Sequence, residues 1–428
     1  GIRFMRELLG DPVDAPIRQD FDPCPLRILG VRYYFNNIIS ALGCRGACEF
    51  CATSAFFHYR KVRLISPAEL WSIMKRRLTE RRYGFIWIFD EDFFDDPDYV
   101  RELARLIDRE KTLTLDRIHW GAFASVRALS AFTIDELVRM GVQSLWIGIE
   151  SKFTHLPKRQ GRDIVELFDA LHAAGITTVG SFIVGWDHHT PENLDEDIAH
   201  VVRLNPTFSQ ISSLMPCPGT RLWKKLEAEK RLRTEGFRWK GFHLYAAMHD
   251  HLRLTDQEVF RGVRKTQRLL YEINGPSVLR SFEVYLQGYR WCKNHQDPRI
   301  RERTAYHERW CRESRPVLTA VRLFLPTPAV REKVERLRRE YLREFGPLGF
   351  SSRVKSYLLV LACLVGLVFR KLPRPPKQPP YKRKVYPGIK SFPKPAAAVA
   401  GKELEKQAAA PETEKTEPLP VIPGKPAC

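Results

Sequence analysis

The segment Tyr34-Phe-Asn-Asn-Ile-Ile-Ser-Ala-Leu-Gly-Cys44-Arg-Gly-Ala-Cys48-Glu-Phe-Cys51 joins an apolar, strand-like run to three cysteines that lie within eight residues. The loop contains Gly43 and Gly46, so its backbone can turn tightly enough for three thiolates to converge on one metal centre. A closed structural site needs four ligands, whereas three thiolates on a [4Fe–4S] cube leave one iron open to a further ligand. The spacing therefore predicts an iron–sulfur cluster with Cys44, Cys48 and Cys51 as its metal ligands.

Two other interpretations of the cysteine triplet stay open at this point. The three thiolates could form a zinc site with a distant residue such as His58, or they could be buried thiols without a metal. The chain has nine cysteines, an odd number, and the other six are scattered. This pattern does not suit a secreted disulfide framework, and it favours a reducing cytoplasm. The scattered cysteines are Cys24, Cys217, Cys292, Cys311, Cys363 and Cys428.

From about residue 29 to residue 225, short β-branched or aromatic runs alternate with longer amphipathic stretches. This alternation is typical of βαβ units and a parallel sheet, and six units suit a partial (β/α)6 TIM-like barrel. We expect strands at 34–40, 85–89, 118–124, 144–149, 178–184 and 208–214. We expect helices at 67–81, 97–109, 133–140, 164–174 and 193–204.

The rest of the chain differs in composition from this α/β core. Residues 226–350 are predicted to be mainly helical, and residues 351–372 to form an apolar helix. Residues 373–428 form a basic tail rich in Pro, Ala, Lys and Glu, which we expect to be disordered. Residues 1–28 are interpreted as a lead-in or linker, and the start at Gly leaves room for an upstream domain before it.

Polar residues follow the predicted strands at the points where chemistry is found in barrels of this kind. The second strand runs into Asp90-Glu91-Asp92, and burying such acids is costly unless they meet donors or cations. The fourth strand ends in Glu150-Ser151. Two further candidates follow the third and fifth strands, namely Ser125 and Gly185.

The CxxxCxxC spacing after the first strand, with Phe50 just before the third cysteine, resembles the radical S-adenosylmethionine (SAM) superfamily. The resemblance covers about residues 29–225. It implies a [4Fe–4S] cluster whose open iron binds the amino and carboxylate groups of SAM. One electron from the cluster would then split the sulfonium C–S bond, and the resulting 5′-deoxyadenosyl radical would abstract hydrogen from a substrate.

The same resemblance implies roles for the residues at the strand ends. Asp90 and Glu91 occupy the position of the family's contact with the methionine amine, although the usual two glycines are absent. Glu150 and Ser151 resemble a Gly-x-Glu-Ser segment that contacts SAM. The remaining expected SAM contacts are Phe50, Ser125 and Gly185.

The acidic pair followed by an aromatic residue, together with Pro216-Cys-Pro-Gly-Thr220, is similar to the cobalamin-binding subgroup. That subgroup implies C-methylation of a small or lipid-like substrate and an electron donor such as flavodoxin or ferredoxin. However, the sequence has no Asp-x-His-x-x-Gly segment, so cobalamin is a hypothesis. Two alternatives stay open: a radical SAM enzyme of RNA-modifying or methylthiotransferase type, and a non-catalytic iron–sulfur or zinc protein.

The formal net charge of +20 at pH 7 indicates an anionic partner. The apolar run at 357–369 has thirteen residues, fewer than the roughly 20 that a spanning helix needs. A polybasic stretch follows it, so we expect either peripheral association with the inner face of an anionic membrane or a helix docked on the core. Nucleic acid ranks second as a partner, because we see no strand pattern for an RNA-binding module.

Overall fold

The computed structural model describes residues 25–28, 31–34, 36–79, 85–233, 247–324, 327–347 and 350–369. These residues belong to the compact unit that runs from Gly1 to Phe369. Most of the expected lead-in, up to residue 24, and the tail expected at 373–428 lie outside the described residues. Residues 25–28, expected as linker, form strand β1 (Pro25–Ile28) and pair antiparallel with β2 (Val31–Tyr34), because extended backbone next to prolines is also strand backbone.

A six-stranded parallel sheet organises the described residues. Its strand order is β10-β9-β8-β7-β6-β3. The strands therefore lie side by side in the same order in which they follow one another along the chain. This result confirms the predicted α/β fold built from six strand–helix units. The strands are β3 (Asn36–Ile38), β6 (Ile86–Ile88), β7 (Trp120–Ala124), β8 (Val142–Glu150), β9 (Thr177–Val184) and β10 (Phe208–Ser213).

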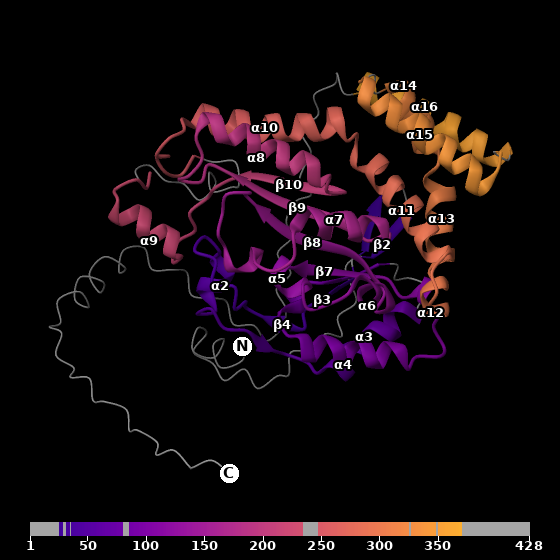
Figure 1. Cartoon of the computed structure of the whole chain (residues 1–428), viewed down its shortest axis with the longest axis horizontal. Helices are drawn as coiled ribbons and strands as arrows, with labels where there is room; N and C mark the ends of the chain where they lie inside the picture. The colour runs from indigo at the N-terminus through magenta and orange to yellow at the C-terminus, as the bar shows by residue number, and fades with distance from the viewer. Residues whose placement is uncertain are drawn as a thin grey trace, which may run out of the picture. The chain divides into compact units, whose positions relative to one another are not determined.

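Helices connect the strands and cover the outer face of the sheet, with α3 and α4 at one edge and α8 and α10 at the other (Figure 1). The predicted helices are present with ends within a few residues of those expected. Capping boxes at Thr133 and Thr190 fix two helix starts, because each side chain accepts a hydrogen bond from a backbone N–H that the helix leaves unpaired. The connecting helices are α3 (Pro67–Thr79), α4 (Pro97–Asp108), α6 (Ile134–Arg139), α7 (Ile164–Ala173) and α8 (Pro191–Leu204).

Short elements complete the core near the cysteine loop. Strand β4 (Ala41–Leu42) pairs antiparallel with β5 (Val62–Arg63), and helix α2 (Ala52–Phe56) lies between them in the chain. Helix α5 (Val126–Leu129) follows β7, and the 3-10 helix η3 (Pro157–Arg159) follows β8. These pieces shape the carboxyl edge of the sheet.

Along each strand, successive side chains alternate between the face of the sheet that packs against the helices and the opposite, inner face. Ile86 and Ile88 of β6 are fully buried against the helix layer, together with Leu70 and Met74 of α3. Trp87, between the two isoleucines, belongs to the opposite face because successive strand residues point to opposite sides. The main hydrophobic core therefore lies between the sheet and its helices, and the inner face of the sheet is left to line a cavity.

From residue 256 to residue 369 the described chain is helical, which confirms the predicted helical C-terminal region. Its second hydrophobic core joins α11, α13, α14 and α15 and includes Phe282, Leu318 and Val334. Among the described residues, no helix has the length and apolarity needed to cross a membrane. The helices are α9 (Arg221–Ala228), α10 (Asp256–Ile273), α11 (Ser277–Lys293), α12 (Pro298–Arg301), α13 (Thr304–Ser314), α14 (Pro316–Phe324), α15 (Pro328–Phe345) and α16 (Phe350–Phe369).

The helical region is tied to the sheet by a buried arginine. Arg303, 1% exposed, donates a hydrogen bond of 2.7 Å from its guanidinium to the carbonyl of Val142, the first residue of β8. The same guanidinium donates to the carbonyl of Val138 and to the side chain of Gln143. Because these acceptors surround the amino end of β8, the helices hold the strand at the end opposite Glu150.

Candidate functional site

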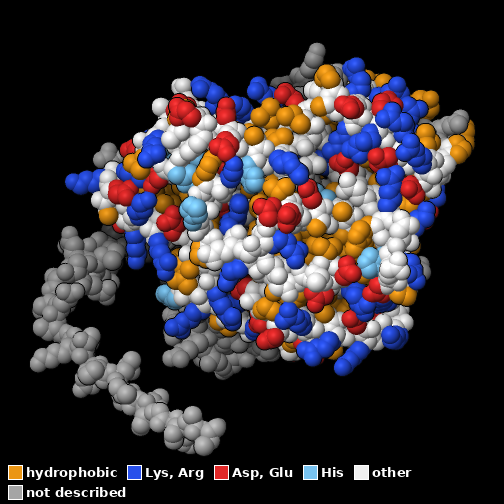
Figure 2. All heavy atoms as spheres, viewed as in Figure 1, with side chains coloured by type: hydrophobic (Ala, Val, Ile, Leu, Met, Phe, Trp, Pro, Cys, Tyr) orange, Lys and Arg blue, Asp and Glu red, His pale blue; other side chains and the backbone are white. Residues whose placement is uncertain are grey.

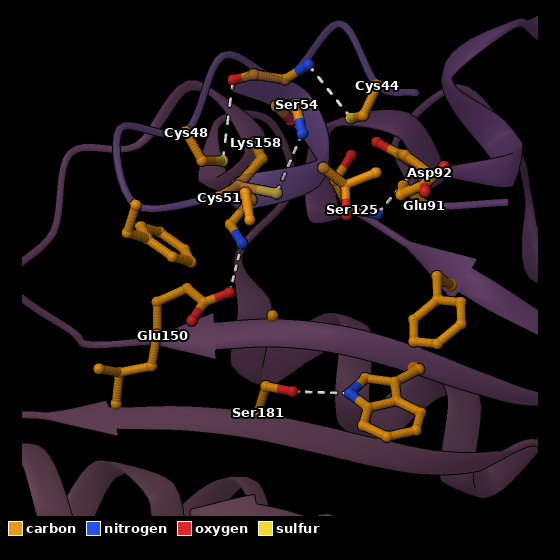
Figure 3. Close-up of a pocket in the computed structure, with 18 of the residues that line it drawn as sticks. Cys44, Cys48, Cys51, Ser54, Glu91, Asp92, Ser125, Glu150, Lys158 and Ser181 are labelled. Carbon is orange, nitrogen blue, oxygen red and sulfur yellow. Dashed lines mark hydrogen bonds and ion pairs between the residues drawn. The ribbon is translucent and has the colours of Figure 1, made fainter. Parts of the chain in front are cut away.

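A cavity of about 510 Å³ lies at the carboxyl ends of the parallel strands. Its lining comes from the cysteine loop after β3 and from the ends of β6, β7, β8, β9 and β10. Figure 3 shows Cys44, Cys48 and Cys51 around one side of this space and Ser181 of β9 on the other. Segments far apart in the sequence therefore contribute to one site, as expected for a parallel sheet.

The conformation of the cysteine loop depends on glycine. Gly43 has a φ of +78°, and a Cβ there would lie 2.1 Å from the carbonyl oxygen of Arg60. A Cβ on Gly46 would lie 3.2 Å from the Sγ of Cys44 and 3.8 Å from that of Cys48. The absence of side chains at both positions lets the loop turn and leaves room around the sulfur atoms.

Backbone N–H groups point at two of the sulfur atoms. Gly46 N donates to the Sγ of Cys44 at 3.2 Å, and Ser54 N donates to the Sγ of Cys51 at 3.5 Å, where Cys51 caps helix α2. Burial raises the pKa of Cys44 to about 12 and also raises the pKa of Cys48. The N–H donors favour thiolates, whereas burial opposes them; the positive charge of a bound metal would favour the thiolates.

Cys44, Cys48 and Cys51 line one cavity. A cuboidal cluster takes each thiolate on a different iron, so three cysteines around one cavity fit such a cluster. A fourth cysteine, Cys217 from the segment after β10, also lines the cavity, and burial raises its pKa.

Glu150 and Lys158 form an ion pair inside the cavity. A β-bulge at the end of β8 gives Glu150 a φ of +59°, which is uncommon for a residue with a side chain. Gly148 makes space for the pair, since a Cβ there would lie 2.3 Å from Oε1 of Glu150. Burial alone would lower the pKa of Lys158, but the charges of Glu150 and Cys48 raise it above its usual value. A charged ammonium group therefore lies near the cysteines.

The three acids after β6 have different surroundings. Asp90 does not line the cavity: it is fully buried and accepts hydrogen bonds from the backbone and hydroxyl of Ser40, from Ala41 N at 3.0 Å and from Arg63 at 3.2 Å. Asp92 lines the cavity and accepts from Ser125 N at 3.1 Å. Glu91 also lines it, and its buried Oε2 has no hydrogen-bond partner in the described structure. Burial raises the pKa of Glu91.

Ser151 and Gly185 lie behind the cavity wall and do not line it. The Ser151 hydroxyl donates to Asp197 of α8, and Nε2 of His189 lies 3.0 Å from the same carboxylate. Nδ1 of His189 accepts from Gly185 N at 3.1 Å. This buried network joins the ends of β8 and β9 to α8. Ser151 and Gly185 therefore position the loops around the site.

The site residues predicted from the sequence fall into two groups in the structure, those that line the cavity and those that do not. The cavity brings together the three cysteines with Phe50, Glu91, Ser125 and Glu150, and it leaves out Asp90, Ser151 and Gly185. Sequence reasoning missed Lys158, Trp146 and Ser181. The alternation of β8 and β9 could have assigned Trp146 and Ser181 to the inner face, but no sequence pattern indicates the position of Lys158.

The inner face of the sheet carries an aromatic wall, which we define as Trp87, Phe89, Phe123 and Trp146. Neighbouring rings are in contact, with Phe123 stacked on Trp146 at a centroid distance of 4.9 Å. Trp146 Nε1 donates to the hydroxyl of Ser181 at 2.6 Å. The charged residues that line the cavity are Glu91, Asp92, Glu150 and Lys158. The other lining residues from β7, β8, β9 and β10 are uncharged: Phe123, Ala124, Trp146, Gly148, Ser181, Ile183, Gln210, Ser212 and Ser213.

The fold and the site define an α/β protein with a cysteine-lined cavity at the carboxyl ends of its parallel strands. Residues 38–201 match the profile of the radical SAM superfamily. This match confirms, for residues 38–201, the resemblance that the cysteine spacing indicated.

Three curated relatives are similar to parts of the chain. An uncharacterized methyltransferase of Pyrococcus horikoshii is 26% identical over 247 residues, which cover 55% of this chain and 51% of that protein. The anaerobic magnesium-protoporphyrin IX monomethyl ester cyclase of Cereibacter sphaeroides is 25% identical, covering 57% and 39%. The hopanoid C-2 methylase of Rhodopseudomonas palustris is 24% identical, covering 47% and 39%. The chain spans about half, or less, of the length of these relatives.

Proposed function

We propose that Cys44, Cys48 and Cys51 bind a [4Fe–4S] cluster and that the adjoining cavity binds SAM. The observation that carries this proposal is the cavity that combines the glycine-shaped cysteine loop with an unpartnered carboxylate oxygen of Glu91. When bound, such a cluster supplies an open coordination position and the electron that splits the sulfonium C–S bond of SAM. In this proposal, Cys217 is not a ligand of the cluster.

The charged residues around the cysteines suit the zwitterionic end of SAM. Glu91 Oε2 is buried and has no hydrogen-bond partner among the described residues, and an ammonium group at hydrogen-bond distance would satisfy it. Glu150, held in place by its ion pair with Lys158, would accept hydrogen bonds from ribose hydroxyls. Ser125 caps helix α5 through its hydroxyl and donates its N–H to Asp92, so it would contact SAM from a fixed position. Phe50, which packs edge-on against Trp186 at 5.4 Å, would help to exclude water.

The uncharged part of the cavity lining favours one class of substrate. In this proposal the charged lining residues bind SAM, and Phe123 and Trp146 of the aromatic wall, with Ile183, leave the substrate an uncharged surface with apolar patches. A neutral, lipid-like molecule would bury apolar area there at little desolvation cost, whereas an ionised substrate would lack a partner. The names of two relatives, for a hopanoid and for a protoporphyrin ester, also refer to ring-containing, mostly apolar molecules.

We propose C-methylation as the reaction, because two of the relatives are named as a methyltransferase and a methylase. Cobalamin is part of this proposal because the chain resembles the cobalamin-binding subgroup. The Asp-x-His-x-x-Gly segment is absent from the sequence, so the resemblance is the only support for this cofactor. Purification from cells supplied with hydroxocobalamin tests it by absorbance. Methyl transfer by protein that carries no cobalamin would rule the cofactor out.

The electron would come from a small donor such as flavodoxin or ferredoxin. The protein would work in the cytoplasm, at the inner face of a membrane from which an apolar substrate could be reached.

Anaerobic reconstitution with iron and sulfide tests the central proposal. We expect about four iron atoms per chain, and SAM-dependent formation of 5′-deoxyadenosine or S-adenosylhomocysteine after reduction with dithionite. Replacement of Cys44, Cys48 or Cys51 by Ala should abolish both, and Cys292→Ala, a buried cysteine far from the loop in sequence, is the matched control. Zinc bound in place of iron, or iron without SAM cleavage, would contradict the proposal.

A further inference from the structure

Helix α16 presents a row of apolar side chains to solvent. Phe350 is 84% exposed, Tyr357 is 72% exposed and Leu361 is 56% exposed. The exposed residues recur at spacings of three and four, so they lie on one face of the helix. We name this face the apolar stripe, and it consists of Phe350, Val354, Tyr357, Leu358, Leu361, Leu364 and Val365.

The opposite face of α16 packs against the protein. Ser356 is buried, and its hydroxyl accepts a hydrogen bond of 3.2 Å from the guanidinium of Arg315, at the start of α14. Leu323 of α14 is also 62% exposed. In Figure 2, apolar side chains are visible among basic ones at the upper right, where Figure 1 places α14, α15 and α16. The stripe is therefore an outer surface of this helical group.

Ordinary surface composition does not account for the stripe. Single exposed apolar residues are common, but seven on one helix face form a contiguous patch, and such patches mark interaction sites. Helix α15, in the same group, shows the usual pattern: its exposed positions include Arg331, Glu332 and Arg339. The difference between these two helices indicates that the outer face of α16 is specialised for a partner.

The sequence that follows α16 indicates the charge of that partner. Residues 370–390, which lie outside the described residues, contain eight Lys or Arg and no Asp or Glu. They begin at the residue after the helix ends, so an anionic surface that meets the stripe would also meet this charge. A second copy paired in parallel along the stripe would bring two such basic segments to the same end, and their repulsion disfavours that arrangement.

We infer that the apolar stripe of α16 binds the surface of an anionic lipid bilayer, with the helix lying parallel to the membrane plane. The helix has 20 residues and is about 30 Å long, so it offers an extended apolar edge that can enter the boundary between headgroups and acyl chains. This docking does not depend on the radical chemistry proposed above.

Sedimentation of the full chain with vesicles tests the inference. We expect binding to vesicles of phosphatidylcholine mixed with phosphatidylglycerol, and weaker binding to phosphatidylcholine alone. Leu361→Glu should lower the partition coefficient by about tenfold or more, because one apolar residue is lost from the buried face and a charge is added. Leu252→Glu is the matched control, since Leu252 is 59% exposed outside α16 and the same change there should have no effect.

A second variant, Tyr357→Glu on the same face, should repeat the loss, and unchanged circular dichroism and melting temperature would show that the variants fold. Equal binding to neutral and anionic vesicles would overturn the proposed lipid charge. Equal loss in Leu252→Glu, or no binding by the wild type, would overturn the surface. A dimer in solution that Leu361→Glu dissociates would show that the stripe binds a second copy instead.

Discussion

Substitution of Lys158 by Met tests the electrostatics of the cavity most directly. The change keeps an unbranched side chain that is one atom shorter and removes its charge, so the buried carboxylate of Glu150 loses its ion-pair partner. Removing one partner of a buried pair costs about 3–5 kcal/mol. Lys158 retains 18% of its side-chain surface exposed and Glu150 retains 5%, so water screens the pair in part and we expect about 2–3 kcal/mol.

Urea unfolding of the metal-free protein at pH 7, followed by circular dichroism, measures this loss. The double variant Lys158→Met with Glu150→Gln separates pairing from packing, because a neutral amide no longer needs a cation. We expect the double variant to recover at least half of the lost stability. If both variants lose the same free energy of unfolding, or if Lys158→Met loses less than about 0.5 kcal/mol, the pair does not stabilise the site as argued.

Three further predictions concern the cysteine loop and the surrounding charges. Gly46→Ala places a methyl group 3.2 Å from the Sγ of Cys44, so the reconstituted protein should lose roughly half of its iron or more with an unchanged melting temperature, measured by iron analysis. Cys217→Ala should keep its iron and its SAM cleavage; a large loss of iron would identify Cys217 as a fourth ligand. Burial would raise the pKa of Asp187, but Arg231 and Lys225 lower it to about 2. Because this pKa is depressed, the stabilisation is present above the unfolded value near 4 and is lost as the pH falls toward 2. Asp187→Asn should therefore cost about 1–2 kcal/mol at pH 7 and little at pH 2, measured by denaturant unfolding across that range.

Much of the fold could be predicted from local sequence, because alternation and helical periodicity act over short distances. The six strands were placed to within a few residues, and the cysteine loop was placed after the first sheet strand. The hairpin of β1 and β2 was missed, because a short extended segment next to prolines reads equally well as a linker.

The site was predictable only in part, because neighbouring residues in a turn can face opposite ways. Asp90 and Glu91 are adjacent, yet the first bonds the backbone of Ser40 and Ala41 while the second lines the cavity. The chain after Glu150, which includes Lys158, follows a bulge at the end of β8, and no local sequence pattern predicts that bulge. Likewise, periodicity makes α16 amphipathic or apolar, but only packing decides which face stays uncovered.

The contact of Arg303 with the start of β8 has a consequence for how the chain can be divided. That strand has nine residues, about 30 Å in all, and it carries Glu150 at its far end. A fragment cut after residue 225 would expose the carbonyl of Val142 and the buried side of Gln143, and it would lose the hydrogen bonds from Arg303 at this end of the strand. The helices after residue 225 thus support β8, the strand that carries Glu150 into the proposed site. Engineering that replaces or shortens these helices should change the proposed activity as well as the solubility.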